Sequence, residues 1–259
     1  MGAESERVRL QRRAFLSGLF LSTFLLSAPA RCMGQSGAFS ARRLLTARGN
    51  RNPERDSALS QWGRELVRRT SAPAVFDPPK VAADSPALLD EPFAIWSDDI
   101  DPGALTVGER RGLEAFLRLG GVLLVDDSQP DVGVFGLAAR RELRRILPES
   151  PPIALEPSHV IYKSFYLVKR PIGRITGPPR VDGIVRGRLP QVLFLSCDLM
   201  GALATRQDGF YRFEVNARSP QQRELAIRFA VNIAMFVLCS DYKDDQVHAE
   251  WIMRRRSRW

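Results

Sequence analysis

Acidic residues that follow predicted buried strands have the clearest potential for chemistry. The stretch Val122–Val125 is apolar throughout, as is typical of a central strand covered on both faces, and Asp126 and Asp127 follow it directly. Two other predicted strands end in acidic residues, the first in Asp98 and Asp99 and the second in Asp198. Because parallel strands end at one edge of a sheet, we expect these carboxylates to converge. There they would bind a hard cation or hold one acid with a raised pKa.

A structural role is the alternative for each of these residues, since an aspartate after a strand commonly caps the next helix or starts a turn. His159, one of two histidines, precedes an aromatic run that contains Tyr162. At the same edge it would act as a general base or a metal ligand, and otherwise it is a structural histidine bonded to backbone. Cys197 would be a nucleophile if it met His159, and is otherwise a small buried residue.

The common metal and nucleotide motifs are absent from the sequence. It contains no His-Glu-x-x-His, no pair of Cys-x-x-Cys, no phosphate loop and no Gly-x-Gly-x-x-Gly, and neither Ser128 nor Ser196 has a Gly-x-Ser-x-Gly context. The sequence therefore identifies no cofactor and no metal. Its three cysteines, Cys32, Cys197 and Cys239, are widely spaced and odd in number, which excludes a disulfide framework.

The helix that precedes the central strand is predicted from clear start and stop signals. Thr106 and Glu109 have the spacing of a capping box, in which each side chain satisfies an amide at the helix start. The apolar face is formed by Leu113, Phe116 and Leu117. Gly120 and Gly121 end the helix, because glycine accepts the left-handed conformation that closes a helix C-terminus.

The same alternation of strand and helix continues along residues 39–240. Strands are predicted at Phe39–Thr46, Phe93–Trp96 and Gln191–Cys197, and helices at Asn52–Arg69, Phe135–Leu147 and Gln221–Cys239. This order predicts an α/β fold, a three-layer sandwich with a mostly parallel central sheet. The 44% hydrophobic content suffices for a core of that size.

Residues 158–189 interrupt this pattern and predict a small β-rich insertion. Two short β-like pieces, Val160–Tyr162 and Phe165–Val168, lie among glycines and prolines, as in an inserted hairpin. The insertion carries four arginines, Arg174, Arg180, Arg186 and Arg188. They would form a flap that recognises an anion, or else belong to an ordinary solvated hairpin.

The two ends of the chain predict export and a basic surface. Residues 1–30 place Arg12-Arg13 before the apolar stretch Phe15–Leu26 and a small-residue site, which resembles a twin-arginine signal peptide, cleaved or kept as an anchor. Residues 31–38 form a linker, and 241–259 a basic tail with two tryptophans. The net charge of +9 suits solubility or anionic envelope partners, including peripheral contact with an anionic membrane surface, and we expect no nucleic-acid partner.

Several ordered stretches resemble a bacterial family, the domain of unknown function 4159. They are residues 119–127, residues 159–166, Asp182-Gly183-Ile184, Cys197-Asp198, Asn232-Ile233 and residues 242–248. The resemblance implies a fold similar to flavodoxin-like proteins and class I glutamine amidotransferases. It also implies partners in the cell envelope, since such proteins are often encoded beside MoxR-type ATPases and membrane proteins with von Willebrand-like domains.

The nucleophile elbow of the amidotransferases is missing from this chain. That elbow is a Gly-x-Cys-x-Gly turn after a central strand, whereas here Asp126-Asp127-Ser128-Gln129-Pro130 follows. The favoured hypothesis is therefore an exported, non-catalytic domain that binds a ligand or protein partner in the envelope. Candidate ligand-binding residues are Asp126, Asp127, His159, Tyr162, Asp198 and Arg188.

Two other hypotheses stay open at this point. The first is a hydrolase of an envelope substrate that uses His159 with Asp127 or Asp198, with or without a metal, or a Cys197–His159 pair. The second is an anion-binding envelope protein that uses the arginine-rich insertion and the basic tail.

Overall fold

The computed structural model describes residues 37–49, 52–187, 189–216 and 219–256, with side-chain environments up to residue 240. The predicted signal peptide and Arg188 lie outside the described residues. The side chains of the predicted basic tail lie outside them too.

A seven-stranded sheet forms the centre of the domain, in the order β2-β1-β3-β4-β7-β6-β5. The strands are β1 (Arg42–Leu45), β2 (Val81–Ala82), β3 (Phe93–Asp98), β4 (Val122–Asp127), β5 (Ile153–Ala154), β6 (Asp182–Arg186) and β7 (Leu189–Leu195). The first five in spatial order are parallel, and β6 pairs antiparallel with β7 and with β5. The prediction of a mostly parallel central sheet is confirmed.

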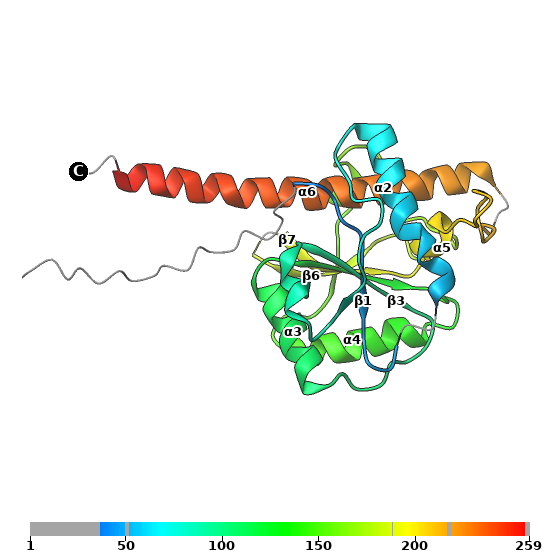
Figure 1. The fold of residues 1–259 in the computed structure, drawn as a ribbon, viewed down its shortest axis with the longest axis horizontal. Helices are drawn as coiled ribbons and strands as arrows, with labels where there is room; N and C mark the ends of the chain where they lie inside the picture. Colours follow the sequence, from blue (N-terminus) through cyan, green and yellow to red (C-terminus); the bar gives the residue numbers. More distant parts are fainter. Residues whose placement is uncertain (1–36, 50–51, 188, 217–218, 257–259) are drawn as a thin grey trace, which may run out of the picture. The chain divides into compact units, whose positions relative to one another are not determined.

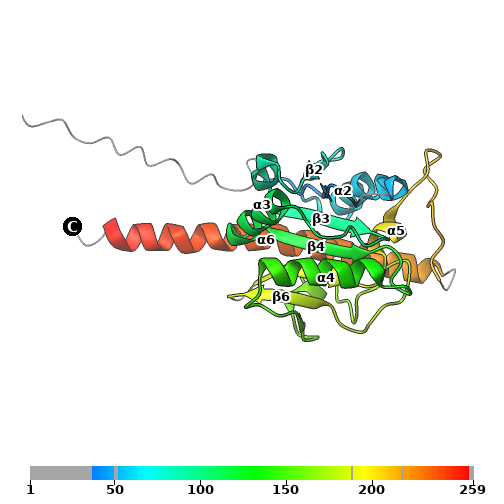
Figure 2. The same ribbon diagram turned by 90° about the horizontal axis from the view of Figure 1, so that it is seen from below.

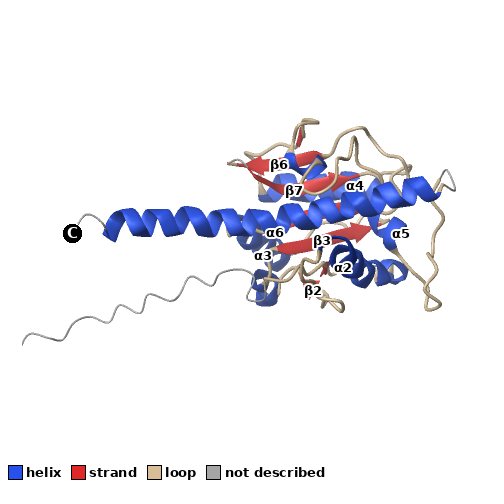
Figure 3. Ribbon diagram, turned by 90° about the horizontal axis from the view of Figure 1, so that it is seen from above, coloured by secondary structure: helices blue, strands red, loops and turns tan. Residues whose placement is uncertain are grey.

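Helices cover both faces of this sheet, as Figures 1 and 2 show. The α-helices are α2 (Ser57–Thr70), α3 (Val107–Arg118), α4 (Val134–Ile146), α5 (Leu199–Leu203) and α6 (Pro220–Arg256). Three short 3-10 helices accompany them, η1 (Pro53–Arg55), η2 (Pro86–Asp90) and η3 (Val160–Tyr162). Helices α3 and α4 pack on one face, whereas α2, α5 and α6 pack on the other (Figure 3), which gives the expected three-layer sandwich.

The central strands bury side chains on both faces, which is why they read as continuous apolar runs. Phe93 on β3 packs with Phe39 and Trp62 on the α6 side, with ring centroids 5.4–5.8 Å apart. Trp96 on the same strand points to the opposite face, where its ring meets Phe135 of α4 edge to face at 5.4 Å. Alternate residues of one strand thus supply both cores.

The predicted capping box at the start of α3 is confirmed. The Thr106 hydroxyl accepts from the Glu109 amide at 3.2 Å, and Glu109 Oε2 accepts from the Thr106 amide at 2.7 Å. Glu109 Oε1 also accepts from the amide of Ala47 at 2.6 Å, so the cap ties the loop after β1 to α3. Gly120 closes the helix with a φ of +93°, as predicted.

The insertion agrees with the prediction in its last part, where β6 pairs antiparallel with β7, and differs in its first part. Val160–Tyr162 is a 3-10 helix, not a strand, and Phe165–Val168 has no regular secondary structure. The physical reason is Asn232 of α6, whose side chain accepts from the amides of Phe165 and Tyr166 and donates to the carbonyl of Tyr166. The backbone groups that a strand would pair are therefore bound by a helix side chain.

Two other boundaries also differ from the prediction. The first strand is shorter than expected, since Phe39 forms only an isolated bridge with Ala74 before β1 begins. The last helix is longer, because α6 continues past the expected end at Cys239 to Arg256, through most of the segment predicted as a tail. No helix among the described residues combines the length and apolarity needed to cross a membrane.

Replacing Thr106 by alanine should lower the free energy of unfolding by about 1 kcal/mol, because the helix loses a capping acceptor. Urea denaturation of the purified protein would measure this change. Thr176→Ala, at an exposed loop position, is the control and should shift the midpoint little. Equal effects of the two substitutions would contradict a stabilising role for the cap.

Candidate functional site

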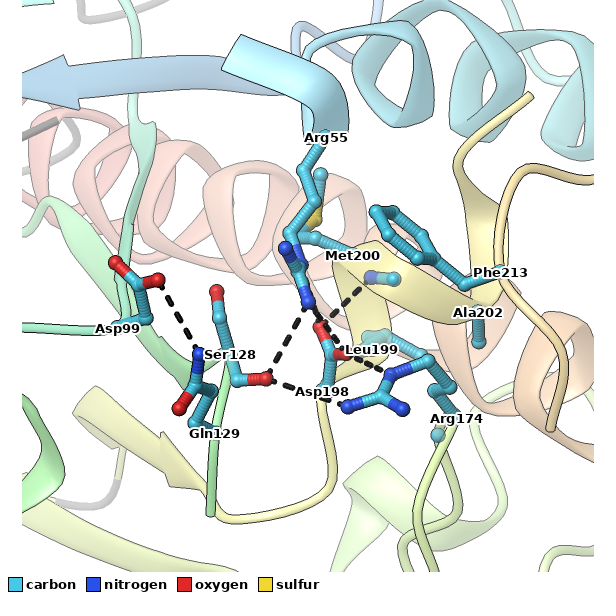
Figure 4. A network of polar contacts seen from close by, with 12 residues as sticks. Arg55, Asp99, Ser128, Gln129, Arg174, Asp198, Leu199, Met200, Ala202 and Phe213 are labelled. Atoms are coloured by element: carbon cyan, nitrogen blue, oxygen red, sulfur yellow. Dashed lines mark hydrogen bonds and ion pairs between the residues drawn. The ribbon is translucent and has the colours of Figure 1, made fainter. Parts of the chain in front are cut away.

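The centre of the carboxyl edge of the sheet is Asp198, which follows β7 and precedes α5. Its side chain is fully buried and its backbone is left-handed, with φ 50° and ψ 63°. Both carboxylate oxygens accept from Arg55, each at 2.9 Å, and Oδ2 also accepts from Arg174 Nε (Figure 4). The amide of Gly201 donates to Oδ1 at 2.9 Å. One buried carboxylate is thus held by two guanidinium groups and a helix amide.

Arg55 joins several segments at this edge. It lies in η1, and beyond Asp198 it donates to the side chain of Asn52 at 3.0 Å and to the carbonyl of Ser128 at 3.3 Å. Its guanidinium carbon lies 4.6 Å from the centre of the Phe213 ring. Burial opposes the charge of Arg55, but the hydrogen bond and charge of Asp198 outweigh burial and raise the pKa of this arginine.

Asp126, at the end of β4, is also fully buried and fastens the central strand to α5. Its two oxygens accept from the amides of Leu199 at 2.9 Å and Met200 at 2.8 Å. Burial raises the pKa of Asp126 to about 8, and repulsion by the neighbouring Asp198 adds to this effect. The two amides favour the charged form and oppose the shift.

Of the other predicted aspartates at the edge, Asp127 and Asp98 bond to backbone, whereas Asp99 accepts from the Gln129 side chain at 3.4 Å. Asp127 accepts from the amides of Gln129 and Gly136, each at 3.0 Å, and so ties the end of β4 to the first turn of α4. Burial raises the pKa of Asp127. Asp98 accepts from the amide of Asp99, and burial together with Asp98 raises the pKa of Asp99. The contacts of Asp127 and Asp98 correspond to the capping and turn roles that the sequence left as the alternative.

His159 lies away from this edge, against α6. Its Nδ1 accepts from the amide of Ile161 at 3.2 Å, so it caps η3, and its ring centre lies 6.1 Å from that of Phe236. Burial and the charge of Lys163 lower the pKa of His159. These contacts match the structural alternative for this histidine.

The length of α6 separates His159 from Asp198. Near the start of α6, Gln222 donates to the carbonyl of Arg174, beside Asp198. Phe236 lies about 21 Å further along the helix axis. The next residue of α6, Val237, lines a small cavity together with Phe93. Phe93 is the first residue of β3, so this part of α6, and His159 with it, lies at the amino edge of the sheet, opposite to Asp198.

Tyr162 and Cys197 are also engaged in the core. The Tyr162 hydroxyl accepts from the amide of Val181 at 2.8 Å, and its ring stacks on Phe229 of α6. Cys197 is buried two residues after the end of β7, and burial followed by repulsion from Asp126 raises the pKa of its thiol well above the usual value. The predicted set therefore divides into Asp126, Asp127, Asp198 and Cys197 at the edge and His159 and Tyr162 along α6.

Two arginines of the site were not predicted in this role. Arg55 carries no sequence signal, because its partner Asp198 is 143 positions away. Arg174 was expected in an anion-binding flap or in an ordinary solvated hairpin, but it turns inward to Asp198. Within the described part of the chain, no group of three or more His, Cys, Asp or Glu side chains is arranged to hold a metal ion.

The sheet, its two helical layers and the buried ion pairs define an α/β sandwich domain. Residues 42–238 match the family model described as "Domain of unknown function (DUF4159)". Since this match covers well over half of the chain, the protein belongs to that family. A search of curated protein sequences finds no match to the chain.

Asp198→Asn should lower the free energy of unfolding by about 3 kcal/mol or more, because it leaves two guanidinium groups beside an uncharged amide. Asparagine tolerates the left-handed backbone at this position, so the variant tests the charge. The matched control is Asp101→Asn, which breaks the exposed pair with Arg141 and should cost less than about 1 kcal/mol. Equal losses in urea denaturation would contradict a central role for Asp198.

Stability should fall as pH rises from about 5 to 8 because of Asp126. Its pKa is about 8 in the folded protein against an ordinary value of 3.8, so in this range the folded state keeps a proton that the unfolded chain has released. Above pH 8 this contribution should level off. The measurement is the free energy of unfolding at several pH values for the wild type and Asp126→Asn, and an identical slope in both would refute the assignment.

Proposed function

We propose that this protein is an exported, non-catalytic amidotransferase-like domain that binds a ligand or a protein partner in the cell envelope. The observation that carries this proposal is the turn after β4, where an amidotransferase would place its nucleophile elbow. Here Asp126 and Asp127 end β4 directly before that turn, and their oxygens are bound by backbone amides. These structural contacts support a non-catalytic role.

The chemistry of the neighbouring groups supports the same proposal. A general acid or base must reach its substrate, whereas Asp126 and Asp198 are fully buried. A nucleophilic cysteine needs an accessible thiolate, whereas burial disfavours the charged form of Cys197. The hydrolase hypothesis needed His159 beside Asp127 or Asp198, and the position of His159 against α6 does not favour it.

The envelope location rests on the N-terminal sequence and on the family resemblance. The paired arginines Arg12-Arg13 before an apolar stretch are the basis for twin-arginine export. The partners we propose are envelope proteins encoded with a MoxR-type ATPase and von Willebrand-like membrane proteins. Within the insertion, Arg174 is turned inward to the buried Asp198, so this arginine does not favour the anion-binding flap.

Replacing Arg12 and Arg13 by lysine should keep the protein in the cytoplasm, because the twin-arginine route requires the arginine pair. Fractionation of cells that express the tagged wild type or the double variant would measure this. Crosslinking in intact cells should then capture a MoxR-type ATPase complex or a von Willebrand-like membrane protein with the wild type only.

Two results would overturn the proposal. Unchanged export of the double variant would refute the twin-arginine route. Release of ammonia from glutamine by the purified protein, lost in Cys197→Ala but retained in Ser196→Ala, would show catalysis and so contradict a non-catalytic role.

A further inference from the structure

A cavity of about 490 Å³ lies between the end of α2, the start of α6 and the segment from Tyr211 to Val215. Its volume falls in the range of about 300–1,000 Å³ that is usual for small-molecule sites. None of the carboxylates of the Asp198 network lines it. It is therefore distinct from the edge described above.

One side of the cavity is apolar and held in place. Val215 and Ile227 are each only 4% exposed, and the ring of Tyr211 lies beside them in the lining. Arg223 supports that ring, since its guanidinium carbon lies 4.0 Å from the ring centre. The same guanidinium donates to the carbonyls of Ala202 and Phe213, so its donors are directed to protein groups.

The two arginines at the end of α2 that line the cavity, Arg68 and Arg69, differ in burial and in the number of carboxylates they bind. Arg69 is largely buried and donates to both Glu65 and Glu224. Arg68 is 66% exposed, and among the described residues it donates to Glu65, at 2.6 and 2.9 Å. Because Glu65 also accepts from Arg69 and from Gln61, Arg68 can leave it without leaving a buried carboxylate unpaired. Arg68 is thus the cation that a ligand can recruit.

The charges of the described lining favour a ligand with one negative group. Among the described residues, three arginines line the cavity and Glu214 and Glu224 line it as well, so this part of the lining carries a net charge of one positive unit. Among the described residues, a polyphosphate would meet two carboxylates and one recruitable guanidinium. A single carboxylate matches the planar fork of one arginine.

We propose that this cavity binds a small amphiphile with an apolar body and one carboxylate group. The apolar body packs against Val215, Ile227 and the Tyr211 ring, and the carboxylate binds Arg68. This inference rests on the binding role proposed above and gives that role a class of ligand. It also places the binding site in this cavity and not in the Asp198 network.

Decanoate and decan-1-ol test the proposal as probes that share an apolar chain and differ in charge. Each displaces 1-anilinonaphthalene-8-sulfonate from the purified full-length protein, and the fluorescence loss gives its affinity. Arg68→Gln should weaken decanoate about tenfold and leave decan-1-ol unchanged. The matched control is Arg118→Gln, a 68% exposed arginine paired with Glu114 on its own helix, which should change neither affinity.

A second variant tests the cavity itself. Ile227→Phe adds volume in the lining and should weaken both probes, while the melting temperature and circular dichroism report whether the fold is kept. Absence of displacement by decanoate, or equal weakening by Arg68→Gln and Arg118→Gln, would overturn the inference. Either result leaves the export and crosslinking experiments untouched, so failure here is distinguishable from failure of the proposed function.

Discussion

The burial of Asp198 between two arginines is the interaction on which the edge of the sheet depends. Moving a carboxylate out of water costs several kcal/mol unless its oxygens are paired and hydrogen-bonded. Arg55 supplies two of these bonds, Arg174 a third and the amide of Gly201 a fourth. Because these donors come from η1, the insertion and α5, satisfying one charge brings three distant segments of the chain together (Figure 4).

The same constraint explains why carboxylates at a ligand-binding edge do not form an open site here. In parallel sheets this edge usually exposes polar groups to a ligand. In this protein Asp126, Asp127 and Asp198 instead bind amides or guanidinium groups of the chain itself. The raised pKa of Asp126 follows from burial and from Asp198, so it marks a fully enclosed acid and not one poised to act on a substrate.

The parts of the fold that could be predicted are those encoded by local sequence. The capping box of Thr106 and Glu109 spans one helical turn, and Gly120 needs only its own backbone freedom, so both were predicted correctly. The aspartates at the strand ends were predicted to share an edge because parallel strands impose it. What they do there was left open between chemistry and capping, since sequence spacing does not reveal whether a carboxylate meets water, a cation or an amide.

The parts that could not be predicted depend on long-range contacts. Asn232 binds the backbone of Phe165 and Tyr166 from 66 positions or more away, and this contact turns a predicted β-like segment into irregular chain. Arg55 and Asp198 are further apart still. The residues that determine the site are therefore charged or polar side chains whose partners no local sequence pattern reveals. The layers around them could be predicted, because the periodicity of the apolar residues is a local pattern.

The segment that covers the Asp198 network also forms a wall of the cavity. The Phe213 ring packs on Arg55, and the backbone carbonyl of Phe213 accepts a hydrogen bond from Arg223. The Arg223 guanidinium in turn packs on the Tyr211 ring, which lines the cavity. The position of this segment is further fixed at Arg174, whose carbonyl accepts from the Asn216 amide. These contacts hold the apolar wall of the cavity in place before any ligand binds. Binding therefore does not have to order this segment, and such preorganisation raises the affinity of a small cavity for its ligand.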